Sequence, residues 1–380
     1  MRLIFVLLAL MLLGSSASAE EKPLTLFAVN VGKADAILLQ SGQTTYLIDT
    51  GTEESWGKLS CALTNLGVTH LTGVIITHTD KDHGGGALTL ATSSIQVEHW
   101  YAPAYYTDVK EKKHPAVMAA ALRNQAVQWL QAGDTIPLDG GTLTVLGPLS
   151  ASETENCNSL VLLAEGGGGR MLLTGDMEFP EEEELLKAGM IPPCQVLKVG
   201  NHGESDATSE ALVRVVQPEI AVISTNSTEE PDTPANRVVK LLMGAGAQIA
   251  QTQHAQAGVL VTLENGKASA QLMGYGEFPA QMTGIVLTGR DAKADHIRIR
   301  NDSVQAVDLS GCYLRSDRGG QQLVLPAGTM LAPGAELLVS TQSSEVPGDI
   351  VWPDEKVWHK SKDDAAYLYD AYGREIAYLP

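Results

Sequence analysis

Four side chains that commonly bind metal ions lie within one short string of this chain. His78, Asp80, Asp82 and His83 fall inside ITHTDKDHGGG (76–86), directly after an apolar run. Imidazole and carboxylate ligands together suit zinc, manganese or iron. We expect a loop here, because a loop can turn side chains at spacings of one, two and four residues toward one point. The string therefore predicts a metal site, and its glycines predict a sharp turn into the next element; the alternative is a solvated polar loop.

Three further acidic or imidazole residues occupy the same kind of position elsewhere. Asp49, Asp176 and His202 each follow an apolar run that predicts a strand. Each alone is typical of a turn or a helix cap, but their shared placement favours a joint role in closing the metal site. A bound divalent ion lowers the pKa of its water from about 15.7 to about 7. Asp82 and Asp176 are the carboxylates that we expect to orient such a water, which makes them the candidate catalytic residues.

The elements that would position these residues alternate between strands and helices from Leu24 to Met273. This alternation predicts a layered α/β architecture. The glycines at 166–169 lie between two expected strands and lack a following Lys-Ser or Lys-Thr pair, so they predict a hairpin turn. The expected strands are 24–30, 35–40, 44–49, 71–77, 142–146, 159–164, 170–174 and 195–199, and the expected helices are 53–66 and 178–188.

Several strings of this chain follow one another in an order that a known family shares. They are VNVGKADA (29–36), LIDTG (47–51), THTDKDHGGG (77–86), NCNSLV (156–161), LLTGD (172–176) and LKVGNHG (197–203). This pattern resembles the metallo-β-lactamase fold superfamily, and within it the extracellular hydrolase domain of ComEC-type DNA-uptake proteins. The resemblance covers roughly residues 24–273. It implies an αββα sandwich with the metal site at one edge of two sheets, and a hydrolase that uses a metal-activated water.

Carried over to this chain, the resemblance implies a role for each matching residue. His78 and Asp80 would serve one metal position, and Asp82, His83 and His202 the other, with Asp176 bridging them. The cofactor would be one or two divalent ions, zinc or alternatively manganese. Asp80 and Asn158 stand where many superfamily members have histidines, so the number of ions stays open. Residues expected around the ligands are Asp49, Asp35 and Asn158, and His254 in the string QTQH is expected to line the pocket.

The two ends of the chain differ in character from this α/β part. Residues 1–19 have one positive charge at Arg2, an apolar run and a final Ala-Ser-Ala, which is typical of a secretory signal peptide. The apolar run is shorter than the roughly 20 residues of a spanning helix. We therefore expect cleavage before Glu20, a secreted protein and no stable membrane insertion afterwards, an uncleaved anchor being the alternative.

Residues 275–380 form the predicted second domain, following a hydrolase domain over residues 20–274. Their β-type runs are punctuated by Gly, Pro, Asn and Asp, which predicts an all-β sandwich. They resemble the lamin-tail domain, which is immunoglobulin-like, and this implies a module that binds a cell-surface or polymeric partner; a stabilising cap is the alternative. The strings that carry this resemblance are HIRIRNDS (296–303), VDLSG (307–311), LPAGT (325–329) and YLYDAYG (367–373).

The charge of the chain limits the substrates that fit the resemblance. A formal net charge of −19 argues against loose attraction of polyanions. The likeness to DNA-uptake proteins nevertheless implies a phosphodiesterase or nuclease whose substrate is nucleic acid or another phosphodiester. The alternatives are a hydrolase of amides or β-lactams, and a non-catalytic binding protein with a degenerate metal site. The chain has no Gly-x-Ser-x-Gly string, which disfavours a serine hydrolase, and its four scattered cysteines leave disulfide pairing open.

Overall fold

The computed structural model describes residues 22–107, 113–276, 280–354 and 356–380. The predicted signal peptide over residues 1–19 lies outside the described residues. Among the residues that are described, no helix is long and apolar enough to span a membrane.

The first of two large sheets has eight strands in the order β17-β16-β1-β2-β3-β5-β7-β8. Neighbours from β17 to β3 are antiparallel, and β3, β5, β7 and β8 are mutually parallel. The strands are β1 (Leu24–Val29), β2 (Ile37–Ser41), β3 (Thr44–Ile48), β5 (Gly73–Ile75), β7 (Trp100–Pro103), β8 (Val127–Leu130), β16 (Gly258–Glu264) and β17 (Lys267–Met273).

The second sheet has seven strands in the order β15-β14-β13-β12-β11-β10-β9. Strands β12 to β15 are parallel, and the predicted glycine turn joins the antiparallel pair β11 and β12. The strands are β9 (Thr135–Leu138), β10 (Gly141–Gly147), β11 (Val161–Gly166), β12 (Gly169–Leu173), β13 (Val196–Lys198), β14 (Ile220–Ile223) and β15 (Gln248–Gln251).

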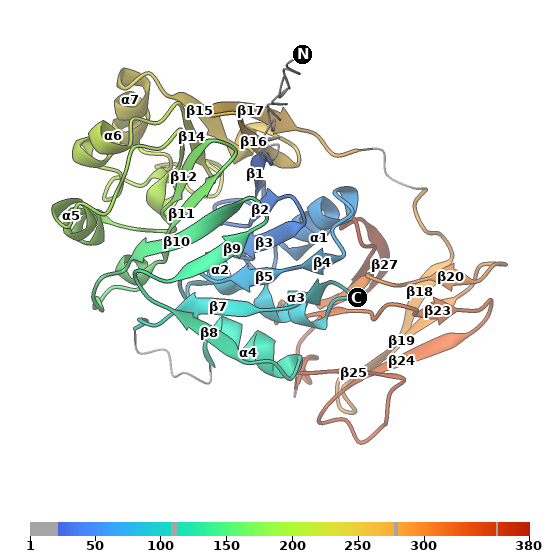
Figure 1. Cartoon of the computed structure of the whole chain (residues 1–380). Coiled ribbons are helices and arrows are strands. Elements are labelled where there is room, and N and C mark those ends of the chain that lie inside the picture. The colour runs from blue at the N-terminus through green and yellow to red at the C-terminus, as the bar shows by residue number, and fades with distance from the viewer. Residues whose placement is uncertain (1–21, 108–112, 277–279, 355) are drawn as a thin grey trace, which may run out of the picture.

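The two sheets face each other, and helices cover their outer sides (Figure 1). Leu39 of the first sheet and Leu162 of the second belong to the apolar core between the sheets. Separate apolar clusters join each sheet to its own helices. This arrangement confirms the predicted αββα sandwich. The first sheet is covered by α1 (Trp56–Asn65), α3 (Ala87–Thr92) and α4 (Pro115–Leu122), and the second by α5 (Phe179–Lys187), α6 (Glu210–Val216) and α7 (Asn236–Gly244).

The segment after β5 differs from the predicted loop and turn. Lys81–Gly84 forms a short helix, α2, so Asp82 and His83 lie on one helical turn. Gly85 and Gly86 also have helical backbone angles, so these glycines do not make a sharp turn. A Cβ atom on Gly86 would lie 2.5 Å from the carbonyl oxygen of Thr50. Glycine is required there because two backbone segments approach each other closely.

The C-terminal region is all-β, as predicted. Two four-stranded sheets and a two-stranded pair enclose one apolar core. Strand β17 ends at Met273 and the next strand begins at Ile285, while the domain boundary at residues 274/275 stays a prediction. The sheets are β18 (Ile285–Asp291), β19 (His296–Asn301), β24 (Glu336–Thr341) and β25 (Ile350–Trp352); β22 (Gln322–Val324), β21 (Tyr313–Ser316), β26 (Ala366–Tyr369) and β27 (Glu375–Leu379); and β20 (Val307–Asp308) with β23 (Met330–Leu331).

This region packs against the helices that cover the first large sheet. Tyr313 and Val324 join the apolar cluster that contains α1 and α3. The Gln322 side-chain amide donates to the carbonyl oxygen of Glu53 at 2.7 Å, and the Ser60 hydroxyl donates to that of Ala371 at 2.7 Å. The four cysteines are all buried and free. The C-terminal region is therefore held by contacts with the α/β part and not by a disulfide.

Candidate metal centre

The expected ligands follow strand ends that meet at one edge of the sandwich. Asp49 follows β3 and His78 follows β5 in the first sheet, while Asp176 follows β12 and His202 follows β13 in the second. Each pair of strands is parallel, so their carboxyl ends open toward the same side, where sites in α/β sheets are commonly built. The backbone of Leu160 donates to that of Thr77 at 2.9 Å, which joins the loops of the two sheets at this edge.

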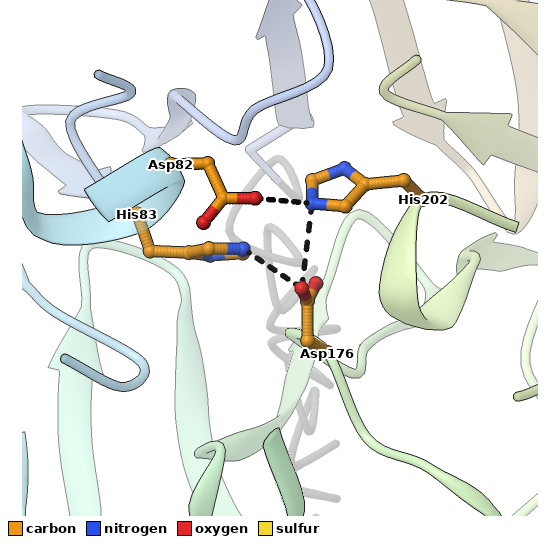
Figure 2. Close-up of side chains that lie close together, drawn as sticks. All are labelled: Asp82, His83, Asp176 and His202. Atoms are coloured by element: carbon orange, nitrogen blue, oxygen red, sulfur yellow. Dashed lines mark ion pairs between the residues drawn. The ribbon is translucent and has the colours of Figure 1, made fainter. Parts of the chain in front are cut away.

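Four of the predicted ligands converge there (Figure 2). Asp82, His83, Asp176 and His202 each offer a ligand atom, and these atoms lie within 4.8 Å of one another. Asp176 Oδ2 is 3.1 Å from His83 Nε2 and 3.3 Å from His202 Nε2. His202 Nε2 is also 3.3 Å from Asp82 Oδ2. The two imidazoles and Asp176 are buried, and Asp82 is partly exposed, so one side of the cluster is accessible to solvent.

Hydrogen bonds to the Nδ1 atoms orient the imidazoles of His83 and His202. His83 Nδ1 lies 2.7 Å from Asp49 Oδ2, and the Asp49 carboxylate also accepts hydrogen bonds from the backbone and hydroxyl of Thr77. His202 Nδ1 lies 2.9 Å from the carbonyl oxygen of Ser224, to which it can only donate. Such partners on Nδ1 fix the tautomer of a metal-binding histidine. Both Nε2 atoms are therefore presented to the cluster as ligand atoms.

The unsatisfied atoms of the cluster fit a cation. In the described part of the chain, Nε2 of His83 and His202 and Oδ1 of Asp176 are buried and have no hydrogen-bond partner. Buried polar atoms are rarely left in this state without a bound ion or water. Nitrogen and carboxylate oxygen are also the donor set of zinc and manganese sites. The donor set and its orphaned atoms thus fit a divalent cation.

The charges of the cluster stabilise one another. Burial alone would lower the pKa of His202, but the carboxylates of Asp176 and Asp82 raise that pKa to about 9. The pKa of His83 is likewise raised well above its usual value by Asp176 and Asp49, against the effect of burial. Burial would raise the pKa of Asp176, but the two imidazoles hold it well below its usual range. The carboxylates are therefore ionised at neutral pH, and the raised pKa values of the two imidazoles show that this group of side chains favours positive charge, which a bound cation would supply in place of the imidazole protons.

His78 and Asp80 form a second pair of possible ligands beside the four. His78 Nε2 lies 3.7 Å from Asp80 Oδ2, and the His78 side chain is buried while that of Asp80 is 51% exposed. The rings of His78 and His83 are 4.1 Å apart between centroids. His78 Nε2 is also buried without a hydrogen-bond partner among the described residues. The pair adjoins the main cluster but offers fewer protein ligands, so both a one-ion and a two-ion centre fit this geometry.

A buried lysine beside the cluster was not predicted. Lys198 Nζ lies 2.7 Å from Asp35 Oδ2, and both side chains are 1% exposed. Burial would raise the pKa of Asp35, but Lys198 lowers it. The backbone N–H of Asp35 donates to the carbonyl oxygen of Asp82 at 3.0 Å, so Asp35 touches the ligand segment. The one feature of the sequence that could have indicated this ion pair is the charged Lys198 inside the apolar run of β13.

A family model described as the metallo-beta-lactamase superfamily matches residues 29–227, slightly more than half of the chain. This chain belongs to the metallo-beta-lactamase superfamily. A second model, described as the Lamin Tail Domain, matches residues 281–379, so the C-terminal region is a lamin tail domain.

Three relatives of this metallo-beta-lactamase superfamily chain share 29% identity with it. ComE operon protein 3 of Bacillus subtilis (strain 168) matches over 246 residues, 59% of this chain and 31% of that protein. Competence protein ComA of Neisseria gonorrhoeae matches 59% of this chain and 30% of that protein. Recombination protein 2 of Haemophilus influenzae matches 52% of this chain and 23% of that protein. The chain thus matches less than a third of the length of each relative.

The side chain of Asn158, which is predicted to lie around the metallo-beta-lactamase site, contacts its own loop. The Asn158 amide accepts from the backbone of Ser152 and donates to the carbonyl oxygens of Ser152 and Thr154. These bonds hold its own loop, and the expectation that Asn158 supports the ligands stays a prediction. The neighbouring Ser159 contacts the ligand residues directly, since its Oγ lies 3.2 Å from His78 Nδ1 and accepts from the backbone of Asp176. Polarity alone does not show which of these two neighbouring residues contacts the ligand residues.

His254 ends the short helix η4 (Thr252–His254). Its side chain is exposed, and neither group of converging ligand atoms in the described chain includes it. Thr252 is the residue of this loop that reaches toward the site, because its hydroxyl accepts from the backbone N–H of Thr225, next to Ser224. His254 is therefore not one of the converging ligands, and the expectation that it lines the pocket stays a prediction.

Proposed function

We propose that this chain is a metal-dependent hydrolase that cleaves phosphodiester bonds, with nucleic acid as its substrate class. The observation that carries the proposal is the convergence of Asp82, His83, Asp176 and His202 within 4.8 Å at the edge of the sandwich. The names of the relatives, competence and recombination proteins, support a substrate of nucleic acid. Because those relatives are much longer, their whole activity is not transferred to this chain.

In this proposal, the four converging residues hold a divalent ion, zinc or manganese, and His78 with Asp80 serves a second. When bound, such an ion acidifies a water and stabilises negative charge on the attacked group. Asp49 and the Ser224 carbonyl keep the two imidazoles in their ligand orientation. Asp176, whose Oδ1 is buried and without a hydrogen-bond partner among the described residues, would hold the ion and help to orient the attacking water. Asp82, at the open side, orients that water.

The remaining parts of the chain are proposed to deliver this activity outside the cell. Residues 1–19 act as a cleaved signal peptide, and the lamin tail domain holds the enzyme on a cell-surface or polymeric partner. Export is tested by N-terminal sequencing of the protein from the culture medium, which should begin at Glu20.

The test of the proposed function combines metal analysis with an activity screen. The purified chain should contain a divalent metal and cleave bis(p-nitrophenyl) phosphate and single-stranded DNA. Asp176→Asn and His202→Ala should lose both metal and cleavage, while His254→Ala, a histidine outside the cluster, should keep both. Turnover of a chromogenic cephalosporin without diester cleavage would instead assign an amide hydrolase. A folded protein with neither metal nor activity would be a binding protein, and the proposal would be wrong.

A further inference from the structure

A group of aromatic side chains lies at the same edge of the first sheet as the metal centre. Trp129 is near the end of β8, Tyr106 follows β7, and His114 caps the N-terminus of α4. The rings of Tyr106 and Trp129 are stacked, with centroids 5.6 Å apart and planes 27° apart. His114 meets both rings edge-on at 5.3 and 5.4 Å. The three rings therefore form one packed cluster, which we call the aromatic cluster.

Strand order places the aromatic cluster beside the metal centre. β5, which leads into His78, pairs in parallel with β7, and β7 pairs in parallel with β8. Their carboxyl ends thus open toward the same edge, where Asp80 is half exposed. Two strand spacings of about 4.8 Å each separate β5 from β8. The backbones of β5 and β8 are therefore about 10 Å apart.

A single carboxylate ties the aromatic cluster to the ligand segment. Glu155 accepts hydrogen bonds from the backbone and hydroxyl of Thr79, which lies between His78 and Asp80. Its other oxygen accepts from the backbone and hydroxyl of Thr107, next to Tyr106. Glu155 thus accepts four hydrogen bonds on its two carboxylate oxygens, and all four form this bridge. The bridge holds the aromatic cluster at a set position relative to the metal centre.

The aromatic cluster is partly open and uncharged. Trp129 is 38% exposed and Tyr106 is half-buried, so the pair has ring surface available to a ligand. His114 is buried, and burial lowers its pKa to about 4, so it is neutral at physiological pH. A cluster of neutral rings offers ring faces on which a flat aromatic group can stack.

From this placement we infer that Trp129 and Tyr106 form a stacking subsite for a nucleobase next to the bond that is cleaved. The inference rests on the proposed function and names its substrate class: a single strand, whose bases are unpaired and free to stack. It also answers the difficulty of a chain with net charge −19, because base stacking supplies affinity without general attraction of phosphates. Stacking on an aromatic side chain accepts every base, so cleavage should depend little on sequence.

Substitution of Trp129 tests the subsite by separating KM from kcat. Trp129→Ala should raise KM for a short oligothymidylate by about tenfold or more, since loss of one stacking contact is worth about 1–3 kcal/mol. The kcat value and the cleavage of methyl phosphodiesters without a base should stay unchanged. Trp129→Phe keeps an aromatic ring and should restore most of the KM. Leu272→Ala, an exposed apolar residue on the opposite edge strand of the same sheet, is the matched control.

A binding measurement keeps this test separate from the test of catalysis. Oligothymidylate should quench the tryptophan fluorescence of the wild-type chain with added chelator, whereas an abasic strand of the same length should bind at least tenfold more weakly. Binding should fall only slightly with salt, in contrast to the steep dependence of phosphate-driven binding. Base-dependent binding without any cleavage would overturn the proposed function but support the subsite. Equal binding of the abasic strand, or unchanged binding and KM in a folded Trp129→Ala variant, would overturn the subsite.

Discussion

At the scale of single residues, the buried pair of Lys198 and Asp35 gives the sharpest expectation. Both side chains are 1% exposed, so removing one charge leaves the other buried without its nearest partner. Lys198→Met should lower the free energy of unfolding by about 3–5 kcal/mol. The double variant Lys198→Met with Asp35→Asn should recover most of that loss, because no buried charge is left without a partner. Urea unfolding of the three variants measures this coupling, and additive losses would show that the pair is not an energetic unit.

The same residues show where prediction from sequence ends. Asp82, His83, Asp176 and His202 were identified because each follows an apolar strand and has a side chain that binds metals. Lys198 and Ser159 were not, since their contacts depend on how the two sheets are placed against each other. The contact of Ser159 with His78 was not expected for the same reason, because local polarity does not determine the direction of a side chain in an irregular loop.

At the scale of elements, Gly86 at the start of α3 lies so close to the segment after β3 that we expect no side chain to be tolerated at this position. Gly86→Ala would place a Cβ atom 2.5 Å from the Thr50 carbonyl oxygen, and Thr50 itself holds the His83 backbone through its N–H and hydroxyl. We expect a clear fall in melting temperature together with a lower metal content. Gly244→Ala in α7, where a Cβ atom meets nothing within 4 Å, should be neutral or stabilising by up to about 1 kcal/mol. A Gly86→Ala protein with normal stability and metal content would contradict this packing argument.

The order of the strands and helices was predicted better than the residues at which they begin and end. The expected strands at 24–30 and 44–49 correspond to β1 and β3. They were predictable because short apolar runs bounded by turn residues are typical of buried strands. The expected strand at 71–77 divided into β4 (His70–Leu71) and β5, which pair with different neighbours. The helical turn at 81–84 was missed because four residues are too few for a periodic pattern.

At the scale of the whole molecule, a titratable carboxyl group lies between the two domains. Glu53 precedes α1, and its Oε1 accepts from the backbone N–H of Gln322 of the lamin tail domain at 3.1 Å. Burial and the neighbouring carboxylates of Asp354 and Glu54 raise the pKa of Glu53 to about 7, against the weaker opposing effects of Gln322 and Arg315. The folded chain thus binds a proton on Glu53 more tightly than the unfolded chain does.

The sign of the resulting pH dependence follows from linkage. A carboxyl group with a raised pKa stabilises the folded state fully below its ordinary pKa of 4.5, and this contribution is lost as the pH rises toward about 7. The contact between the domains should therefore weaken over this range, as Glu53 ionises beside Asp354. Glu53→Gln keeps the shape but removes the titration, so the difference in melting temperature between wild type and Glu53→Gln should change steadily from pH 4.5 to 7, in the direction that favours the variant at higher pH. Glu153→Gln, an exposed carboxyl group that does not contribute to the raised pKa of Glu53, is the control. A pH-independent difference for Glu53→Gln would mean that this carboxyl group does not couple protonation to the docking of the two domains.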